Sequence, residues 1–253
     1  MIEYKNKQRP EKEMIFGIRA VIEAIAAGQE IDKILIRRDM TNDLSRELFA
    51  ALQGFEVPVQ KVPLEKLNRF TMKNHQGVIA FISPVAYQHI ENIIPAIYED
   101  GRMPFIVVLD GVTDVRNFGA IARTCECAGV DAIVVPLKGG AALNGDAVKT
   151  SAGALMTIPV CREHSLTNVL KYLSASGIKV VAASEKASLN YSEVNMTEPL
   201  ALVMGSEDEG VAPDHLKLCD EMVRIPVVGA IESLNVSVAA GVLMYEVIRQ
   251  RKM

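Results

Sequence analysis

The sequence predicts an α/β protein in which a small α/β domain precedes a larger domain built on a mostly parallel sheet. Two observations lead to this prediction. Apolar strand patterns alternate with helical patterns along the chain, which is typical of sheets covered by helices. In the second part the strands are continuous apolar runs, such as FIVVLD at 105–110, as expected when both faces of a sheet are buried.

The first domain is expected over residues 13–85, after a polar segment, 1–12, that we expect to be flexible. FGIRAVIEAIAAG spaces its apolar residues as a helix does and stops at Gly28. IDKILIR then predicts a strand, residues 42–53 a helix, VPVQKV a strand, PLEKLNRFT a short helix and GVIAFIS another strand.

The second domain is expected over residues 105–253, after a partly helical linker at 86–104. The strands DAIVVP, MTIPVC, IKVVAAS, PLALVMG and MVRIPV follow FIVVLD with helical segments between them, and a helix over 234–251 closes the chain. In an open parallel sheet, ligands bind beyond the carboxyl ends of the strands. The loops that follow these strands are therefore the candidate site.

Composition excludes several classes of protein. The chain of 253 residues has no apolar run long enough to cross a membrane, and its start lacks the apolar core of a signal peptide, so we expect a cytoplasmic protein. Four cysteines and four histidines are scattered without metal-ligand spacing, so no metal is expected. A net charge of −4 argues against an extended nucleic-acid-coating surface but leaves room for a local basic site.

The first candidate loop, VRNFGAIAR, contains Asn117 and Arg123. If a helix starts near Asn117, Arg123 lies one to two turns inside it, and a helix N-terminus with an arginine fork suits a phosphate group. Alternatively, Asn117 only caps the helix and Arg123 makes a surface ion pair. No GxGxxG pattern follows this strand, so a dinucleotide bound in the usual way is not indicated.

The second loop, in VMGSEDEGV, places Gly205, Glu207 and Gly210 directly after an apolar strand. Glycines let a ligand approach the backbone closely, although a plain acidic turn would have the same sequence. A metal site on Glu207 and the two carboxylates after it is not favoured, because no histidine is near to complete it.

The third loop ends in IESLNVSVAA, where Ser233, Asn235 and Ser237 occupy every second position at the start of a helix. Ser233 is a good candidate for the N-cap residue. Capping by Ser233 would not need Asn235 as well, so capping alone does not explain why Asn235 stands here.

Taken together and in this order, the three loops resemble the SpoU/TrmH family of RNA 2′-O-methyltransferases. The matching stretches are LDGVTDVRNFGAIART, LALVMGSEDEGV and IPVVGAIESLNVSVAAGVLMYEVIRQR, so the resemblance covers 105–251. FGIRAVIEAI and NHQGVIA extend it into the first domain, which resembles the family's small RNA-binding domain and, through it, a ribosomal protein. The closest subgroup is the RlmB type, which methylates a guanosine of 23S rRNA, although Arg19 stands where that subgroup often has histidine.

The resemblance implies a SPOUT-type α/β fold with a deep trefoil knot in the second domain. It also implies S-adenosylmethionine as cofactor, a homodimer that assembles each active site, and structured RNA as substrate, with rRNA preferred to tRNA. The implied catalytic positions are Asn117, Arg123, Glu207, Ser233, Asn235 and Ser237. The implied cofactor-contacting positions are Met204, Gly205, Gly210, Ile225, Val227, Gly229 and Leu234.

Selection of the RNA is expected to belong to the first domain, because the cofactor pocket cannot supply it. The candidate RNA-contacting residues are Arg19, Arg37, Arg38, Lys73 and His75. Arginine is a poor base, so we expect Arg123 to anchor a phosphate, with Glu207 orienting it or accepting a hydrogen bond. Two alternatives stay open: the same chemistry on tRNA, and a non-catalytic RNA-binding protein with this fold.

Overall fold

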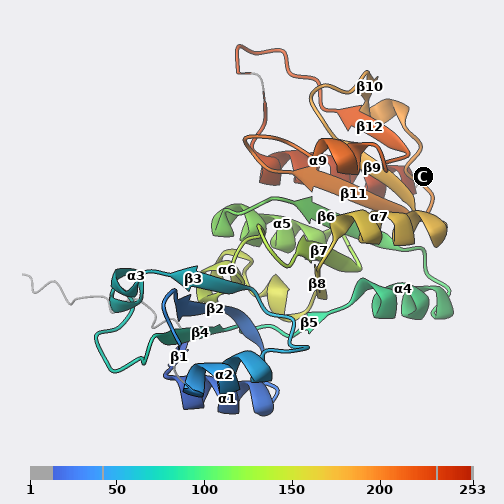
Figure 1. Cartoon of the computed structure of the whole chain (residues 1–253). Helices are drawn as coiled ribbons and strands as arrows, with labels where there is room; N and C mark the ends of the chain where they lie inside the picture. Colours follow the sequence, from blue (N-terminus) through green and yellow to red (C-terminus); the bar gives the residue numbers. More distant parts are fainter. Residues whose placement is uncertain (1–13, 42, 232, 252–253) are drawn as a thin grey trace, which may run out of the picture. The chain divides into compact units, whose positions relative to one another are not determined.

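The computed structural model describes residues 14–41, 43–231 and 233–251. These residues form two compact units that meet in the sequence at Pro84 and Val85, and both are drawn in Figure 1. Each unit has its own sheet and its own apolar core, so each is described by itself. The expected flexible segment 1–12 lies outside the described residues.

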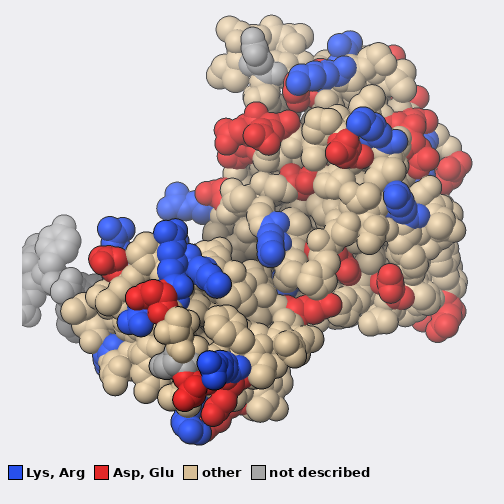
Figure 2. Space-filling model, in the orientation of Figure 1, with Lys and Arg blue, Asp and Glu red and all other residues tan. Residues whose placement is uncertain are grey.

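The first unit is a four-stranded sheet of order β1-β4-β2-β3, in which β2 and β3 run parallel and the other pairs antiparallel. Alternate residues of β2 face opposite sides, where Ile34 and Leu35 enter two separate apolar clusters. On the face seen in Figure 2, basic and acidic side chains are interspersed over this unit. Its elements are β1 (Met14–Phe16), α1 (Ile18–Ala26), β2 (Ile31–Arg37), α2 (Asp43–Ala51), β3 (Val59–Val62), α3 (Leu64–Asn68) and β4 (Val78–Ile82).

The second unit is an eight-stranded sheet of order β10-β12-β9-β11-β6-β7-β8-β5, and all of its strand pairs are parallel. The α/β fold with a mostly parallel sheet is therefore confirmed. The strands are β5 (Tyr87–Gln88), β6 (Phe105–Asp110), β7 (Ala132–Pro136), β8 (Val160–Glu163), β9 (Lys179–Ala183), β10 (Leu189–Asn190), β11 (Leu200–Gly205) and β12 (Glu221–Arg224). The helices are α4 (Ile90–Glu99), α5 (Val115–Cys127), α6 (Gly145–Thr150), η1 (Ala154–Met156), α7 (Leu166–Ala175), η2 (Tyr191–Glu193), α8 (Pro213–Leu216) and α9 (Val236–Arg251).

The segment expected as a partly helical linker, 86–104, folds as part of the second unit. Its strand β5 pairs with β8, and the backbone nitrogen of Ile90, at the start of α4, donates to Glu163 at 2.9 Å. Ile90, Ile94 and Ile97 are buried in an apolar cluster beneath the sheet. Their helical spacing, interrupted in the sequence by Pro95, is what joins α4 to this core.

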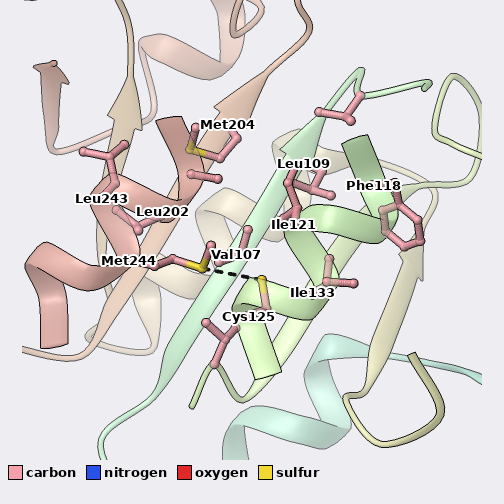
Figure 3. Packing of buried hydrophobic residues seen from close by; sticks show 14 of the residues in the cluster. Val107, Leu109, Phe118, Ile121, Cys125, Ile133, Leu202, Met204, Leu243 and Met244 are labelled. Carbon is pink, nitrogen blue, oxygen red and sulfur yellow. Dashed lines mark hydrogen bonds between the residues drawn. The ribbon is translucent and has the colours of Figure 1, made fainter. Parts of the chain in front are cut away.

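The closing helix α9 packs against α5 in the largest core of the second unit. Figure 3 shows Met244 of α9 facing Cys125 of α5, with their sulfur atoms 3.6 Å apart. Leu243 and Val247 of α9 are also fully buried. The first candidate loop leads into α5 and the third leads into α9. Packing of these two helices therefore holds the ends of the two loops near one another.

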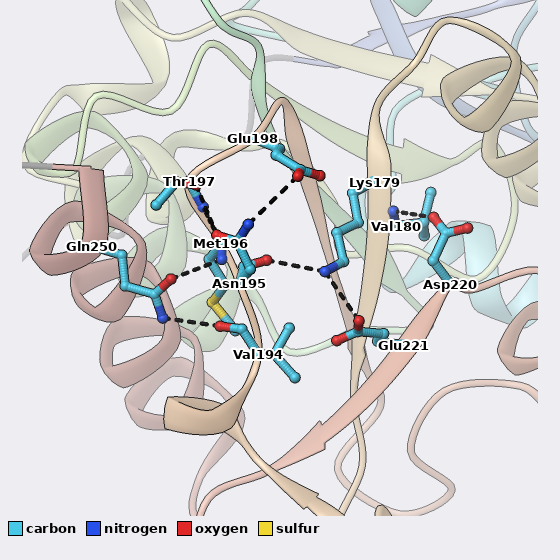
Figure 4. A network of polar contacts seen from close by, with 10 residues as sticks. All are labelled: Lys179, Val180, Val194, Asn195, Met196, Thr197, Glu198, Asp220, Glu221 and Gln250. Carbon is cyan, nitrogen blue, oxygen red and sulfur yellow. Dashed lines mark hydrogen bonds and ion pairs between the residues drawn. The ribbon is translucent and has the colours of Figure 1, made fainter.

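The C-terminal end of α9 is tied to the segment before β11, as Figure 4 shows. Gln250 accepts from the backbone nitrogen of Met196 at 2.8 Å and donates to the carbonyl of Val194 at 3.0 Å. On the other side of this segment, Lys179 donates to the carbonyl of Asn195 at 3.0 Å. The helix is therefore anchored at its end as well as along its buried face.

Candidate active site

The candidate site lies at the carboxyl ends of the two central strands β6 and β11, which are neighbours in the sheet. The loop after β6 leads into α5, the loop after β11 leads into α8, and the loop after β12 leads into α9. The structure thus brings the three candidate loops to the same edge of the sheet, where the parallel topology predicts them.

The first loop ends in a helix cap that leaves Asn117 available. Asp114 accepts hydrogen bonds from the backbone nitrogens of Arg116 at 2.8 Å and Asn117 at 2.9 Å, so it is the N-cap of α5. The reading in which Asn117 caps this helix is therefore wrong. Asn117 lies in the first turn of α5, and its side chain donates to Glu207 of the neighbouring loop.

Asn117, Glu207 and Asn235 form a hydrogen-bonded triad that joins the three loops. Asn117 donates from Nδ2 to Oε1 of Glu207. Asn235 donates from its own Nδ2 to the same Oε1 at 3.2 Å and to Oδ1 of Asn117 at 3.1 Å. Because both amides donate to Oε1, the second carboxylate oxygen of Glu207 has no partner among the described residues.

The cap of α9 is Asn235, which corrects the assignment of that role to Ser233. Oδ1 of Asn235 accepts from the backbone nitrogen of Ser237 at 2.9 Å and from its hydroxyl at 2.6 Å. α9 begins at Val236, two residues later than expected. The Asn235 side chain therefore both caps α9 through Oδ1 and donates to Glu207 through Nδ2. The capping hydrogen bonds orient the amide so that Nδ2 faces Glu207.

The second loop requires glycine where it leaves the strand. A Cβ atom on Gly205 would overlap the backbone of Gly210 and Val211, which fold back against the strand end. Ser206 and Gly210 exchange backbone hydrogen bonds of 3.1 and 3.0 Å, and Gly210 has a φ of 70°. The sequence suggested that these glycines let a ligand approach the backbone closely. In the structure, the segment that approaches Gly205 is the backbone of Gly210 and Val211 in the same loop.

A cavity of about 780 Å³ opens between the second and third loops. Its lining includes six of the seven expected cofactor-contacting residues, namely Met204, Gly205, Gly210, Ile225, Val227 and Leu234. Gly229, the seventh, is not among its lining residues. Ser233, Glu207 and Asn235 also line this cavity, so it adjoins the triad.

One wall of the cavity was missed from the sequence. Residues 183–186, which include Glu185 and Lys186, follow β9 and line the cavity beside the second loop. β9 is the neighbour of β11 in the sheet, so its carboxyl end reaches the same site. Only the strand order reveals this, because nothing in SEKAS itself indicates a ligand.

A smaller cavity of about 220 Å³ lies on the other side of the second loop. It is lined by residues 111–114, Asn117 and residues 206–209, so Glu207 borders both cavities. The carboxylates of Asp114, Asp208 and Glu209 belong to its lining residues, which makes it strongly acidic. Asp208 and Glu209 line the larger cavity as well, so the second loop forms an acidic wall between the two cavities.

Arg123 is not brought to the triad within one chain. It lies exposed on α5, six residues after Asn117, which on a helix turns its side chain about 120° away. No hydrogen bond or ion pair of Arg123 is formed with any described residue, and it lines neither cavity. Ser237 also lies outside both cavities. Its hydroxyl donates to Oδ1 of Asn235 and so helps to hold that side chain in place.

The RNA-contacting candidates of the first unit divide into two groups. Arg19, Arg38 and Lys73 are exposed, and Arg37 is half-buried beside Asp39, whose carboxylate lies 2.9 Å from its Nε.

His75 is 7% exposed, so its assignment to an RNA surface is corrected. Its Nδ1 accepts from the backbone nitrogen of Gly77 at 3.0 Å, which leaves Nε2 to donate to Asn68 at 2.9 Å. His75 instead supports the loop that carries Lys73.

The described residues also bear on membrane spans and metal sites. None of the helices there combines the length and the apolar character needed to cross a membrane. Nor do the histidines, cysteines and carboxylates of those residues gather into a group of three that could hold a metal ion.

The sequence is similar to known RNA methyltransferases along most of its length. Residues 104–245 match the SpoU rRNA methylase family, and residues 14–88 match the substrate-binding domain of RNA 2′-O ribose methyltransferases. A protein of Staphylococcus saprophyticus, whose name places it in the TrmH family of tRNA/rRNA methyltransferases, is 35% identical over 241 residues. The alignment covers 95% of this chain and 97% of that relative.

Two solved structures share the fold over nearly the whole chain. An RNA 2′-O ribose methyltransferase is 27% identical with a TM-score of 0.56, over 95% of this chain and 89% of the other. The methyltransferase AviRb of Streptomyces viridochromogenes, solved with S-adenosylmethionine, is 25% identical with a TM-score of 0.60, over 94% and 90%. In both comparisons the aligned region includes the two units described above.

Proposed function

The chain belongs to the SpoU rRNA methylase family of RNA 2′-O ribose methyltransferases, and we propose that its target is a guanosine of 23S rRNA. The enzyme class and the cofactor, S-adenosylmethionine, follow from the family and its structures. The observation that carries the assignment of the site is the triad of Asn117, Glu207 and Asn235 at the edge of a cofactor-sized cavity. We also propose that the protein is cytoplasmic, because bacterial rRNA is found in the cytoplasm.

The larger cavity suits S-adenosylmethionine in size and in chemistry. About 780 Å³ is within the range of small-molecule sites. Met204, Ile225 and Leu234 offer apolar contact to an adenosine ring, and Lys186 offers a cation to a carboxylate. The cofactor, when bound, supplies a methyl group already activated by its sulfonium.

We assign the positioning of the ribose to the triad. The Oε1 atom of Glu207 is held by the two amides, so its second oxygen is fixed in direction and can accept a hydrogen bond from the 2′-hydroxyl. The ribose oxygen would take the methyl group as its bond to sulfur breaks and the neutral thioether leaves, and the hydroxyl proton would pass to the free oxygen of Glu207 and from there to water. Much of the rate enhancement then comes from alignment.

A homodimer is proposed to complete each site. Glu207, Asp208 and Glu209 have no cationic partner among the described residues of their own chain, and Arg123 is equally unpaired. Apolar residues of the third loop are exposed, with Ile231 at 78%. We propose that a second copy covers this surface and brings its Arg123 to the acidic loop, where it also anchors the RNA phosphate. A deep trefoil knot in the second unit is part of the same proposal.

The acidic character of the smaller cavity supports guanosine as the target. Guanine presents two adjacent N–H donors on its Watson–Crick edge, and a carboxylate accepts both. Asp208 and Glu209 are exposed carboxylates on the lining of that cavity.

Methyl transfer from labelled S-adenosylmethionine to total rRNA and tRNA, followed by mapping of the modified nucleotide, tests this function. We expect label in a single guanosine of 23S rRNA. Label only in tRNA would overturn the proposed target while keeping the chemistry. Transfer to neither RNA, with RNA binding intact, would favour a non-catalytic RNA-binding protein.

A further inference from the structure

The carboxylate of Asp110 lies where the loop bearing Glu207 rejoins the fold. Asp110 ends β6 and stands opposite Gly205, the last residue of β11, in the parallel register. Its Oδ2 accepts a hydrogen bond from the backbone nitrogen of Ala212 at 2.8 Å and lies 2.7 Å from Nδ1 of His215. One carboxylate oxygen therefore holds the far end of the loop and the helix α8 together.

The loop between these two points, residues 206–211, is braced internally. Besides the paired backbone bonds of Ser206 and Gly210, the backbone nitrogen of Glu209 donates to Oγ of Ser206 at 3.1 Å. The loop also fills the space beside Gly205. The position of this braced loop therefore depends on its two ends, and Asp110 holds the end at Ala212.

Among the described residues, His215 supplies the one side-chain donor to Asp110. The two side chains are 17% and 13% exposed, so water replaces a lost donor poorly. A neutral imidazole carries one ring proton, and the carboxylate of Asp110 places it on Nδ1. The charged imidazolium donates from the same atom, so the contact exists in both protonation states.

We propose that His215 is a positioning residue for methyl transfer, acting through Asp110 on the loop that carries Glu207. This inference rests on the proposed function, since it concerns the same site. Without the contact, the end of the loop at Ala212 shifts, and Glu207 moves relative to Asn117 and to the cavity wall. A misplacement of about 1 Å can cost about a hundredfold in rate. We expect kcat to fall by about tenfold to a hundredfold, with KM for RNA nearly unchanged.

His215→Asn and His215→Leu separate the hydrogen bond from the bulk of the side chain. Asparagine presents an N–H near the position of Nδ1, whereas leucine fills similar space without a donor. We expect the leucine variant to lose kcat and affinity for S-adenosylmethionine, and the asparagine variant to recover most of both. Lys217→Ala is the matched control, because it breaks an exposed pair with Asp214 beside the same helix and should change neither.

Wild-type kcat and cofactor affinity in His215→Leu would overturn the inference. An equal loss in the leucine and asparagine variants, in step with a lower melting temperature, would overturn it too and assign His215 to the fold alone. If the leucine variant does not fold, His215→Gln, whose donor lies at the position of Nε2, takes its place. If the wild type transfers no methyl group, the proposed function fails, and calorimetric cofactor affinity of the same variants still tests the contact.

Discussion

The amide nitrogen of Asn235 lies 3.2 Å from Oε1 of Glu207, so the cap of the last helix is bonded to a loop 28 residues earlier in the chain. The other end of the same side chain caps α9 through the backbone nitrogen of Ser237. The Nδ2 atom of Asn235 bonds to Glu207, whereas its Oδ1 atom caps the helix. A substitution can therefore remove one of these hydrogen bonds and keep the other.

Asn235→Asp keeps the cap and removes the amide donor. Aspartate caps helices as well as asparagine does, so the melting temperature should stay close to that of the wild type. Its carboxylate would face Glu207 without an intervening N–H, and loss of one such donor at an active site costs about a hundredfold in kcat. Calorimetry and a methyl-transfer assay on the same preparation measure the two effects.

Asn235→Ala is the comparison for that variant. It removes the cap as well as the amide donor, so it should lose about 1 kcal/mol of unfolding free energy in addition to activity. An aspartate variant as active as the wild type would show that the amide of Asn235 is not needed for the reaction.

Gly205→Ala should abolish binding of S-adenosylmethionine. A Cβ on Gly205 meets backbone atoms of Gly210 and Val211, which cannot move aside as a flexible side chain could. The loop that walls the cavity would be displaced, and the protein destabilised by strain. Isothermal titration with the cofactor and a thermal melt measure both results.

Gly229→Ala is the control for this effect. Nothing lies within 4 Å of a Cβ at Gly229, and the residue does not line the cavity, so cofactor affinity should be unchanged. Equal affinity in both glycine variants would show that the close approach at Gly205 does not shape the site.

The strands of the second unit and the edge of the sheet that holds the site could be predicted from the sequence, because buried parallel strands are continuous apolar runs. The three candidate loops met where FIVVLD and PLALVMG end, as their shared topology requires. What could not be predicted is which side chains pair across loops. Asp114 and Asn235 cap helices while Asn117 and Ser233 do not, although all four belong to residue types that are good caps.

Neighbour relations in the sheet also had to come from the structure. The wall at residues 183–186 depends on β9 lying beside β11, and strand order is not written in any local pattern. In the same way His75 stands in a polar, exposed-looking stretch, NHQG, and is buried because a backbone nitrogen and Asn68 satisfy its ring.

The ion pair of Glu246 with Arg249 should make the stability of α9 depend on pH. The guanidinium of Arg249 donates to this mostly buried carboxylate and holds the pKa of Glu246 below its ordinary value of 4.5. A lowered folded pKa means that the stabilisation is complete above pH 4.5 and is lost as the pH falls below it. Urea melts between pH 7 and pH 3 should show a smaller acid loss for Glu246→Gln than for the wild type.

Lys217→Ala serves as the control in those melts, because Lys217 pairs with a fully exposed aspartate whose ion pair adds little stability. Parallel curves for the wild type and Glu246→Gln would show that other carboxylates account for the acid loss.

Mixing two inactive variants should restore activity if each site takes Arg123 from the second copy. One variant is Arg123→Ala and the other is Glu207→Gln, each expected to be inactive alone. In a mixed dimer, one site pairs the intact Glu207 of the first variant with the intact Arg123 of the second, while the other site lacks both. Random re-association of equal amounts gives mixed dimers for about half of the population, so about a quarter of wild-type activity should return.

The same experiment distinguishes a site built within one chain, because no mixed dimer would then hold both residues in one site. Activity would stay at the level of the single variants, although dimers form. Native mass spectrometry of the mixture, which separates the three dimers by the mass lost in Arg123→Ala, confirms that exchange took place. A mixture of Arg123→Ala with Asn117→Ala repeats the test for one of the two amides that bind Glu207. Since Asn117 bonds to Glu207 of its own chain, this second pair should also regain activity, which fixes the side of the interface from which each triad residue comes.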